Sequence, residues 1–271
     1  MTERGLAARG IDTNTPNVAR IYDYLLGGKD NFAADRAAAQ QLMAATPDIA
    51  GIVRDNRSFI GRAVRYLVNE AGIRQFLDLG GGLPTQLNVH QMAQHAAPDA
   101  RVVYVDNDPV VFVHGQALLA RGGGVAMVCA DLRTPADILQ HPEVARLFDL
   151  AQPVAVVCAS VLHFVPDEDE PHRIIAEYRD RLAPGSYLVI SHGASATEEE
   201  DPTGVVDSFT SVYRQASAQL HVRSVPEIRR FFDGFDLVDP GVVWLSEWRP
   251  DPGIPPSGQV TSLRAGVGRK L

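Results

Sequence analysis

Five short apolar runs, alternating with longer stretches of helical pattern, are the feature that most constrains the fold of this chain. The runs lie at residues 76–79, 102–105, 125–129, 154–158 and 187–191. A strand that is apolar at nearly every position is covered on both faces, which is typical of a parallel sheet flanked by helices. The alternation therefore predicts an α/β fold built from βαβ units.

Helices are predicted between these strands and beyond them. Their expected ranges are 86–97, 110–120, 135–147, 172–182, 206–220 and 225–232. Shorter apolar runs follow at 235–238, 242–245 and 262–267, the last of them after a proline-rich loop at 249–259. Because that loop is neither helix nor strand, the closing strands suggest an antiparallel edge on an otherwise parallel sheet.

The part of the chain before the first strand has a different character. Residues 1–15 are expected to be disordered, and the ranges 18–26, 36–45 and 52–71 show helical patterns. We therefore predict two units, an N-terminal helical cap or lid at 1–71 and an α/β domain at 72–271.

Composition excludes several classes of partner. The net charge of −8 makes a broad phosphate-neutralising surface a poor expectation, so nucleic acid is not a predicted partner. No apolar run approaches the roughly 20 residues that cross a bilayer, and the first residues lack a secretory pattern. We expect a cytoplasmic protein that makes no membrane contact. The sequence does not indicate its oligomeric state.

The two cysteines, Cys129 and Cys158, each end an apolar run. Neither belongs to a Cys-x-x-Cys pair or to another spacing that holds a metal ion, so no metal site is predicted. Buried, reduced thiols are the simpler expectation, because free cysteine packs as a small apolar side chain.

A glycine cluster connects the first predicted strand to the next helix. The string Asp78-Leu-Gly-Gly-Gly-Leu-Pro-Thr85 contains Gly80, Gly81 and Gly82. Glycine permits positive φ and close ligand approach, and a helix start offers free N–H donors, so the segment predicts a cradle for a nucleotide-like ligand. A dinucleotide fingerprint would need Gly or Ala where Thr85 stands, and a P-loop would need Gly-Lys-Ser/Thr.

Acidic residues stand at or near the ends of the first three strands. They are Asp78, Asp106 and Asp131. Ligands of open α/β sheets bind at the carboxyl ends of the strands, and a carboxylate after the second strand can hold both hydroxyls of an adenosine ribose. The alternative for Asp106 is a solvated turn residue. Asp108, followed by Pro109, is expected to cap the next helix.

These strings resemble a known family. The segments that carry the resemblance are Ala19-Arg-Ile-Tyr-Asp-Tyr-Leu-Leu-Gly-Gly-Lys-Asp-Asn, Asp78-Leu-Gly-Gly-Gly-Leu-Pro-Thr, Asn88-Val-His, Val103-Tyr-Val-Asp-Asn-Asp-Pro, Ala130-Asp-Leu-Arg, Leu162-His-Phe-Val and Pro184-Gly-Ser-Tyr-Leu-Val-Ile-Ser-His. They are similar to the actinobacterial S-adenosylmethionine-dependent methyltransferases once catalogued as a domain of unknown function. The resemblance covers nearly the whole chain and implies the seven-stranded, Rossmann-like class I methyltransferase fold. It implies no particular acceptor.

The resemblance also implies a cofactor site. Gly80, Gly81 and Gly82 would lie beside the methionine part of S-adenosylmethionine, and Asp78 would orient its amino or carboxylate end. Asp106 would hold the ribose hydroxyls. Asn107 would flank the adenine, whereas Asp131 and Leu132 would meet its edge. Ser160, which follows the fourth strand, is also counted among the cofactor-binding residues.

His163 is the candidate catalytic residue. The segment from Ser160 to Glu170 is similar to the His-aromatic-x-Asp-Glu segment of small-molecule O-methyltransferases, in which that histidine is the base. The alternative, packing or cofactor contact, carries more weight. Positioning of two reactants contributes roughly 7–11 kcal/mol, whereas a base contributes about 3–5 kcal/mol, so a base is optional. His192 is open between a structural role and an acceptor-site role.

The N-terminal string from Arg20 to Phe32 mixes aromatic, charged and glycine residues. One interpretation is a lid that closes over cofactor and acceptor, with Tyr22 and Lys29 reaching inward. The other is that Tyr22 belongs to a helical core and Gly27-Gly28 ends the helix.

The leading hypothesis is therefore an S-adenosylmethionine-dependent methyltransferase that acts on oxygen or nitrogen of a small molecule. Two alternatives remain at this point. One is a non-catalytic cofactor-binding or regulatory protein on the same fold. The other is an NAD-dependent oxidoreductase, against which Thr85 and the antiparallel tail argue.

Overall fold

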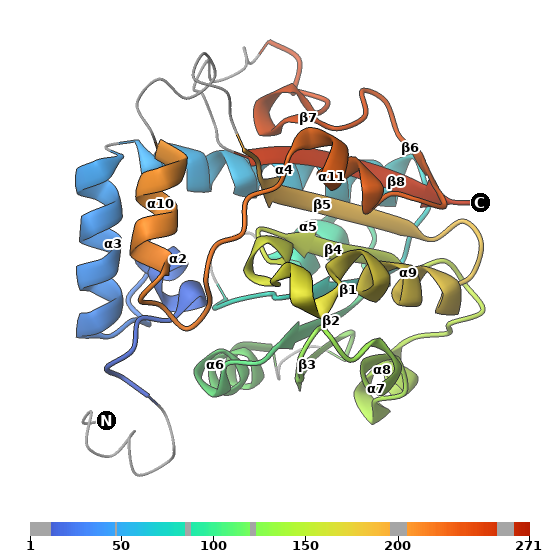
Figure 1. Cartoon of the computed structure of the whole chain (residues 1–271). Helices are drawn as coiled ribbons and strands as arrows, with labels where there is room; N and C mark the ends of the chain where they lie inside the picture. The colour runs from blue at the N-terminus through green and yellow to red at the C-terminus, as the bar shows by residue number, and fades with distance from the viewer. Residues whose placement is uncertain (1–11, 47, 85–87, 120–122, 196–204, 254–262) are drawn as a thin grey trace.

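The computed structural model describes residues 12–46, 48–84, 88–119, 123–195, 205–253 and 263–271, which form one sheet with helices around it (Figure 1). The strands are β1 (Gln75–Leu79), β2 (Arg101–Asp106), β3 (Val125–Cys129), β4 (Ala155–Ala159), β5 (Tyr187–Gly193), β6 (Phe235–Leu237), β7 (Val243–Trp244) and β8 (Leu263–Lys270). Their order is β3-β2-β1-β4-β5-β8-β6, and β7 also pairs with β8.

The pairing of the strands confirms the predicted class of fold. β1 to β5 are parallel to their neighbours, whereas β8 runs antiparallel to β5, β6 and β7. Seven strands make up the path, as expected, and the two-residue β7 is an addition. The strand order reverses at β1, which lies between β2 and β4, so the carboxyl ends of these strands border the crevice in which such sheets bind ligands.

Two helical layers cover the sheet. One consists of α4 (Ile49–Asn69), α5 (Val89–Ala96) and α6 (Pro109–Leu119), whose apolar side chains pack on Phe76, Val102 and Tyr104. The other consists of α7 (Pro135–Leu139), α8 (Pro142–Leu147), α9 (Pro171–Arg181) and α11 (Val225–Arg230), which pack on Leu77, Val103 and Val105. Successive strand residues thus face opposite layers, which explains why the strands are continuously apolar.

A third apolar cluster lies beside the sheet. It joins α2 (Val18–Leu25), α3 (Ala33–Ala45) and α10 (Val205–Tyr213) to the first half of α4. Its side chains include Ile21, Leu42, Ile52 and Phe209. Figure 1 shows α3 and α10 side by side at one end of the molecule. The division of the chain after residue 71 stays a prediction. In the structure, α4 packs both in this helical cluster and on the sheet, and α10, from a distant part of the chain, packs in the helical cluster.

Some predicted elements differ from the structure. The helix expected at 135–147 is two helices, because Pro142 has no N–H to continue the first and begins α8 instead. The helix expected at 206–220 ends at Tyr213. The predicted disorder at 1–15, the loop at 249–259 and the start of the 86–97 helix fall wholly or partly outside the described residues.

The two cysteines agree only in part with the prediction of buried, reduced thiols. Both are free thiols, but Cys158 is buried and Cys129 is exposed at the end of β3, which corrects the prediction of two buried thiols.

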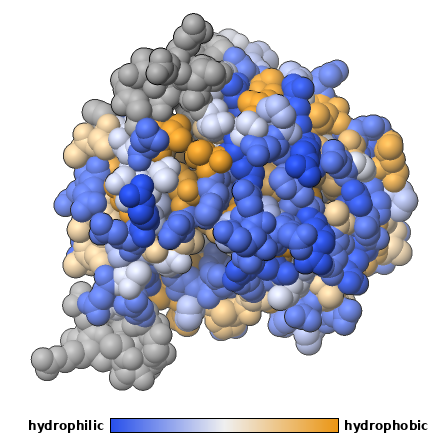
Figure 2. Space-filling view, in the orientation of Figure 1, coloured by the Kyte–Doolittle hydropathy of each residue, from blue (hydrophilic) through white to orange (hydrophobic). Residues whose placement is uncertain are grey.

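Within the described ranges, no helix is long and apolar enough to cross a membrane. The face seen in Figure 2 is mostly hydrophilic. The large apolar side chains exposed in the described part of the chain are Met43, Val113, Leu237 and Leu271.

Candidate active site

A cavity of about 930 Å³ opens at the carboxyl ends of β1 to β4. This volume lies near the upper end of the usual range for ligand sites, roughly 300–1,000 Å³. The loops after the strands form one side of it, and α2, α4 and α10 form the other. The residues predicted from the sequence that line it are Tyr22, Asp78, Gly80, Gly81, Gly82, Asp106, Asn107, Asp131, Leu132, Ser160 and His163.

The three glycines after β1 serve three different needs. A Cβ on Gly80 would lie 2.3 Å from a methyl group of Val161, and one on Gly81 would lie 2.8 Å from the Tyr104 ring. Gly82 has φ +65° and faces open space, with Ala19 Cβ 4.0 Å away. A larger residue at Gly80 or Gly81 would displace Val161 or Tyr104, and one at Gly80 or Gly82 would be strained, because both have positive φ.

The Asp106 carboxylate is tied to the glycine turn. Its Oδ2 accepts a hydrogen bond from the Gly82 N–H at 3.0 Å, and its Oδ1 accepts one from the Asp108 N–H at 2.9 Å. Burial raises the pKa of Asp106 to about 6, against the opposing effect of these hydrogen bonds. The carboxylate therefore carries charge at pH 7 in a place from which water is largely excluded.

Asp78 adds a second buried carboxyl to the same wall. Burial raises its pKa to about 7, and the Asp106 charge acts in the same direction while the Arg57 charge opposes it. Two desolvated carboxyls at one edge favour a ligand that brings positive charge or hydrogen-bond donors, because either would stabilise the ionised forms.

The loop after β3 holds its acid differently. Asp131 forms an ion pair with Arg133 at 2.5 Å, and Arg133 also pairs with Asp169 at 2.6 Å. Partial burial raises the pKa of Asp131, but the hydrogen bonds from Arg133 outweigh this effect and lower it. The Leu132 carbonyl accepts a hydrogen bond from the Tyr178 hydroxyl at 2.9 Å. Asp131 and Leu132 both line the cavity, and each is held by a partner within the protein, Arg133 for the first and Tyr178 for the second.

A chain of hydrogen-bonded polar groups connects the sheet to α2 beside the cavity. Ser160, at φ +54°, donates its N–H to Ser191 Oγ at 2.9 Å. Ser191 Oγ donates to Asn56 Oδ1 at 2.6 Å, and Asn56 Nδ2 donates to Tyr22 Oη at 3.0 Å. Val53 O accepts a hydrogen bond from Tyr22 Oη at 3.4 Å. Neither Asn56 nor Ser191 was predicted as a site residue, because their partners are remote along the chain.

His163 lies in the cavity wall but is buried, with 5% of its surface exposed. Its Nδ1 accepts a hydrogen bond from the Gly193 N–H at 3.0 Å. Burial, together with the Arg223 charge, lowers the pKa of His163 to about 3. The neutral ring then carries its proton on Nε2, so the lone pair that a base would use is already occupied. This geometry favours the packing alternative over the predicted catalytic role.

His192 has a structural place. It is fully buried, its Nδ1 lies 2.7 Å from the Gly193 carbonyl, and its Nε2 lies 2.9 Å from Arg223 Nη1. Arg223 was not predicted, yet it ties the segment after β4 in place by donating to Leu162 O, to Val165 O and to the Asp167 carboxylate. The second alternative for His192, an acceptor-site role, is not favoured.

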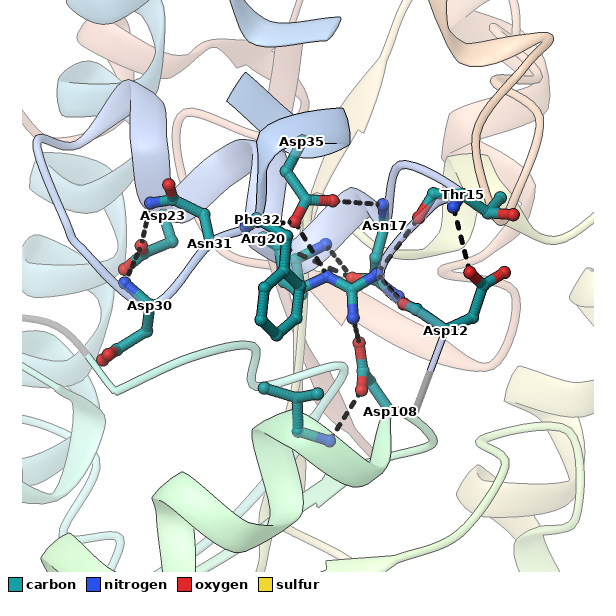
Figure 3. A network of polar contacts seen from close by, with 12 residues as sticks. Asp12, Thr15, Asn17, Arg20, Asp23, Asp30, Asn31, Phe32, Asp35 and Asp108 are labelled. Atoms are coloured by element: carbon teal, nitrogen blue, oxygen red, sulfur yellow. Dashed lines mark hydrogen bonds and ion pairs between the residues drawn. The ribbon is translucent and has the colours of Figure 1, made fainter. Parts of the chain in front are cut away.

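Lys29 departs from its predicted place, because it is exposed and does not line the cavity. The turn that carries it is held by Asp23, whose Oδ2 accepts hydrogen bonds from the Asp30 N–H and from Asn31 Nδ2 (Figure 3). Gly27 has φ +82° directly after α2, which agrees with a helix stop.

The Arg20 guanidinium contacts two carboxylates and two backbone carbonyls in the N-terminal region and the loop after β2 (Figure 3). It is buried, with 4% exposure, and its Nε lies 3.1 Å from Asp35 Oδ2. Its Nη1 lies 3.6 Å from Asp108 Oδ2, and its Nη2 donates to Asp12 O and Thr15 O, both at 3.1 Å. This role of Arg20 was not predicted from the sequence. The available signal was a charged residue directly before Ile21, on the face of the helix that its apolar residues mark as buried.

The far side of the cavity is built mainly from apolar side chains. They come from α2, α4 and α10 and from the segment after α10. Examples are Leu25, Ile52, Val53, Phe209 and Leu220. No run of neighbouring residues in the sequence marks this wall, because its members meet only in the folded chain.

Comparison with known proteins adds an independent finding. The family model described as S-adenosyl methyltransferase matches residues 4–271. A candidate methyltransferase from Thermobifida fusca YX is 43% identical, with a TM-score of 0.89 over 96% of this chain and 97% of that one. A DUF574 family protein from Streptomyces avermitilis MA-4680 is 40% identical, with a TM-score of 0.89 over 96% and 99% of the two chains.

More distant structures share the fold alone. Human N-acetylserotonin methyltransferase, solved in complex with S-adenosylmethionine, is 14% identical, with a TM-score of 0.50 over 98% of this chain and 66% of that one. No curated protein matches the sequence. The family match over nearly the whole chain places it among methyltransferases rather than NAD-dependent oxidoreductases. This chain belongs to the S-adenosyl methyltransferase family and is an enzyme that uses S-adenosylmethionine.

Proposed function

We propose that this enzyme transfers the methyl group of S-adenosylmethionine to an oxygen or nitrogen atom of a small molecule. The observation that carries the proposal is that the Gly82–Asp106 turn and the apolar wall of α2, α4 and α10 line the same cavity. One end suits a polar cofactor, and the other suits an acceptor with an apolar body.

The residues of the first end fit the cofactor. Asp106 would hold the ribose hydroxyls, because its carboxylate is ionised at neutral pH and fixed by two backbone N–H groups. Gly82 leaves room beside it. The buried Asp78 carboxyl suits the cationic end of the ligand. When bound, the cofactor supplies an electrophilic methyl group on a positively charged sulfur.

The residues of the second end orient the acceptor and exclude water. Phe209, Ile52 and Leu25 supply an apolar surface, and the hydrogen bonds of Tyr22 with Asn56 fix the aromatic ring against it. Orientation of this kind contributes about 7–11 kcal/mol, more than a general base does. We assign His163 to the wall of the site, where its Nε2–H is available as a donor, and not to proton removal.

The test is a transfer assay with ¹³C-methyl-labelled cofactor and a small-molecule extract of an actinobacterium. We expect one or a few labelled small molecules, and the chemical shift of the new methyl carbon will tell oxygen from nitrogen. The matched control is Asp106→Ala, which should lower labelling at least tenfold when the cofactor is supplied below its dissociation constant for the variant. Label in the protein or nucleic-acid fraction alone, or no product from a folded enzyme that binds the cofactor, would disprove a small-molecule acceptor.

We also propose that the enzyme works in the reducing environment of the cytoplasm. The supporting observation is that Cys129 and Cys158 are free thiols and that Cys129 is exposed at the edge of the sheet. Thiols are kept reduced in the cytosol, whereas oxidising compartments favour disulfides.

A further inference from the structure

The N-terminal segment Asp12–Ala19, called the strap below, lies against the cofactor end of the cavity. Asp12, Thr15, Asn17 and Val18 all line the cavity, as do the residues of the loop after β2. A ligand held by Asp106 is thus bounded by the strap as well as by the glycine turn. Ala19, the last residue of the strap, is the nearest neighbour of the open space at Gly82.

Arg20 connects the strap to the loop after β2. Its Nη2 donates to two carbonyl groups of the strap, those of Asp12 and Thr15, while its Nη1 faces the Asp108 carboxylate (Figure 3). Arg20 and Asp108 are both buried. An ion pair shielded from water is screened little by salt, so the position of one partner depends strongly on the other.

Asp108 is in turn connected to the residue proposed to hold the ribose. Its N–H donates to Asp106 Oδ1, and its own Oδ1 accepts from the Val110 N–H at the start of α6. A movement of the Asp106 carboxylate therefore changes the position of Asp108, and through it that of Arg20 and the strap.

The strap is fixed at its other side to the acceptor end of the cavity. The Ser217 N–H donates to Pro16 O at 2.8 Å, and the Val18 N–H donates to Ser217 Oγ at 3.4 Å. Ser217 itself lines the cavity. The strap thus contacts both halves of the site.

We propose that the strap is a clasp that closes over the bound cofactor, with Arg20 as the positioning residue that couples its closure to Asp106 through Asp108. The inference rests on the proposed placement of the cofactor at Asp106, but not on the identity of the acceptor. By linkage, an ordered strap and a bound cofactor stabilise each other, so weakening the Arg20–Asp108 connection weakens cofactor binding while Asp106 is kept.

The test combines S-adenosylhomocysteine affinity, measured by calorimetry, with amide hydrogen exchange of the strap. Arg20→Lys keeps the positive charge but loses the Nη2 group that donates to both carbonyls. Asp108→Asn keeps the cap on Val110 but loses the charge. In the wild type we expect the ligand to slow exchange of the strap about tenfold. In either variant we expect that slowing to be largely lost and affinity to fall about fivefold or more.

Two matched controls separate coupling from general damage. Arg62→Lys alters a similar fork, which holds the carbonyls of Trp248 and Leu245 away from the cavity. Asp149→Asn alters a similar carboxylate, which accepts from the Ala151 N–H on the surface. Neither should change affinity or strap exchange. Melting curves will show whether each variant is folded. If Arg20→Lys does not fold, the test of the coupling rests on Asp108→Asn.

Two results would overturn the inference. One is strap exchange that the ligand leaves unchanged in the wild type. The other is a folded Asp108→Asn enzyme with wild-type affinity while Asp106→Ala binds weakly, which would leave the cofactor placement intact. If Asp106→Ala also bound normally, the placement itself would be wrong.

Discussion

The two ends of the cavity are built in opposite ways. The cofactor end is made of short loops that follow neighbouring strands, and its groups are held by backbone hydrogen bonds such as those on Asp106. The acceptor end is made of helices from distant parts of the chain, and its side chains are mostly apolar. The first end is suited to one invariant ligand, whereas the second can change its shape by substitution without disturbing the first.

The largest expected effect is at the cofactor end. Asp106→Ala should weaken S-adenosylhomocysteine binding more than tenfold, because it removes the fixed charge proposed to hold the ribose hydroxyls; tenfold corresponds to about 1.4 kcal/mol. Calorimetry measures it, and Asp137→Ala, at an exposed position of α7, is the control. Unchanged affinity in the folded variant would remove the basis for the difference between the two ends.

Asp78 should affect the pH dependence of stability. Its pKa is raised from 3.8 to about 7, so the folded state keeps a proton over this range that the unfolded state has lost. The contribution of this group is therefore fully present below about pH 4, falls by about 1.4 kcal/mol per pH unit as pH rises from there to about 7, and is absent above that.

Asp78→Asn removes this charge and should melt at higher temperature than the wild type at about pH 8, with a difference that shrinks toward about pH 6. The titrating histidines are present in both proteins, so they cancel in the comparison. Melting curves of the ligand-free proteins at several pH values measure the difference. A gap that does not change with pH would show that Asp78 is ionised like an ordinary surface carboxylate.

Substitution at the acceptor end should change stability but not cofactor affinity. Tyr22→Phe removes the hydroxyl that joins Asn56 to Val53 O and should cost about 1 kcal/mol of folding free energy. Binding of S-adenosylhomocysteine should stay within about threefold, because this hydroxyl is already bound within the protein. A larger loss of affinity would place Tyr22 in direct contact with the cofactor, as the sequence first indicated.

The Arg133 ion pairs at the rim should matter less. Arg133 is 46% exposed, and exposed ion pairs typically contribute about 0.2–1 kcal/mol. We expect Arg133→Ala to shift the melting temperature by only a few degrees and to lose that small effect at high salt. A loss comparable to that of Asp106→Ala would mean that the loop after β3 has to be clamped for the cofactor to bind.

The smallest expected effect is at His163. Because its pKa is lowered to about 3, its ring should stay neutral from about pH 5 to pH 8. Imidazole signals followed by NMR should therefore not titrate in this range, with His163→Gln used to assign them. A titration near pH 6.5 would restore the histidine as a candidate base.

The contrast between local loops at the cofactor end and remote contacts at the acceptor end also explains which features could be predicted from the sequence. The strands, the glycine turn and Asp106 were accessible because each rests on neighbouring residues, on apolar runs or on backbone geometry. Asn56 and Ser191, which are 135 positions apart, meet only after folding, and so do the partners of Arg20. The hydrogen bond that favours the packing alternative for His163 was inaccessible for the same reason, since its Nδ1 partner is the remote Gly193. Lys29 was misplaced because the hydrogen bonds of Asp23 turn that segment outward.

The helix α4 has a consequence for how the protein unfolds. Its 21 residues span about 31 Å, and its first half packs in the N-terminal cluster through Ile52 and Val53 while its second half packs on the sheet through Val64 and Leu67. Loss of either cluster exposes one half of the same helix. We therefore expect the helical cap and the sheet to unfold together, so that a substitution in the wall of the acceptor site lowers the stability of the sheet that holds the cofactor as well.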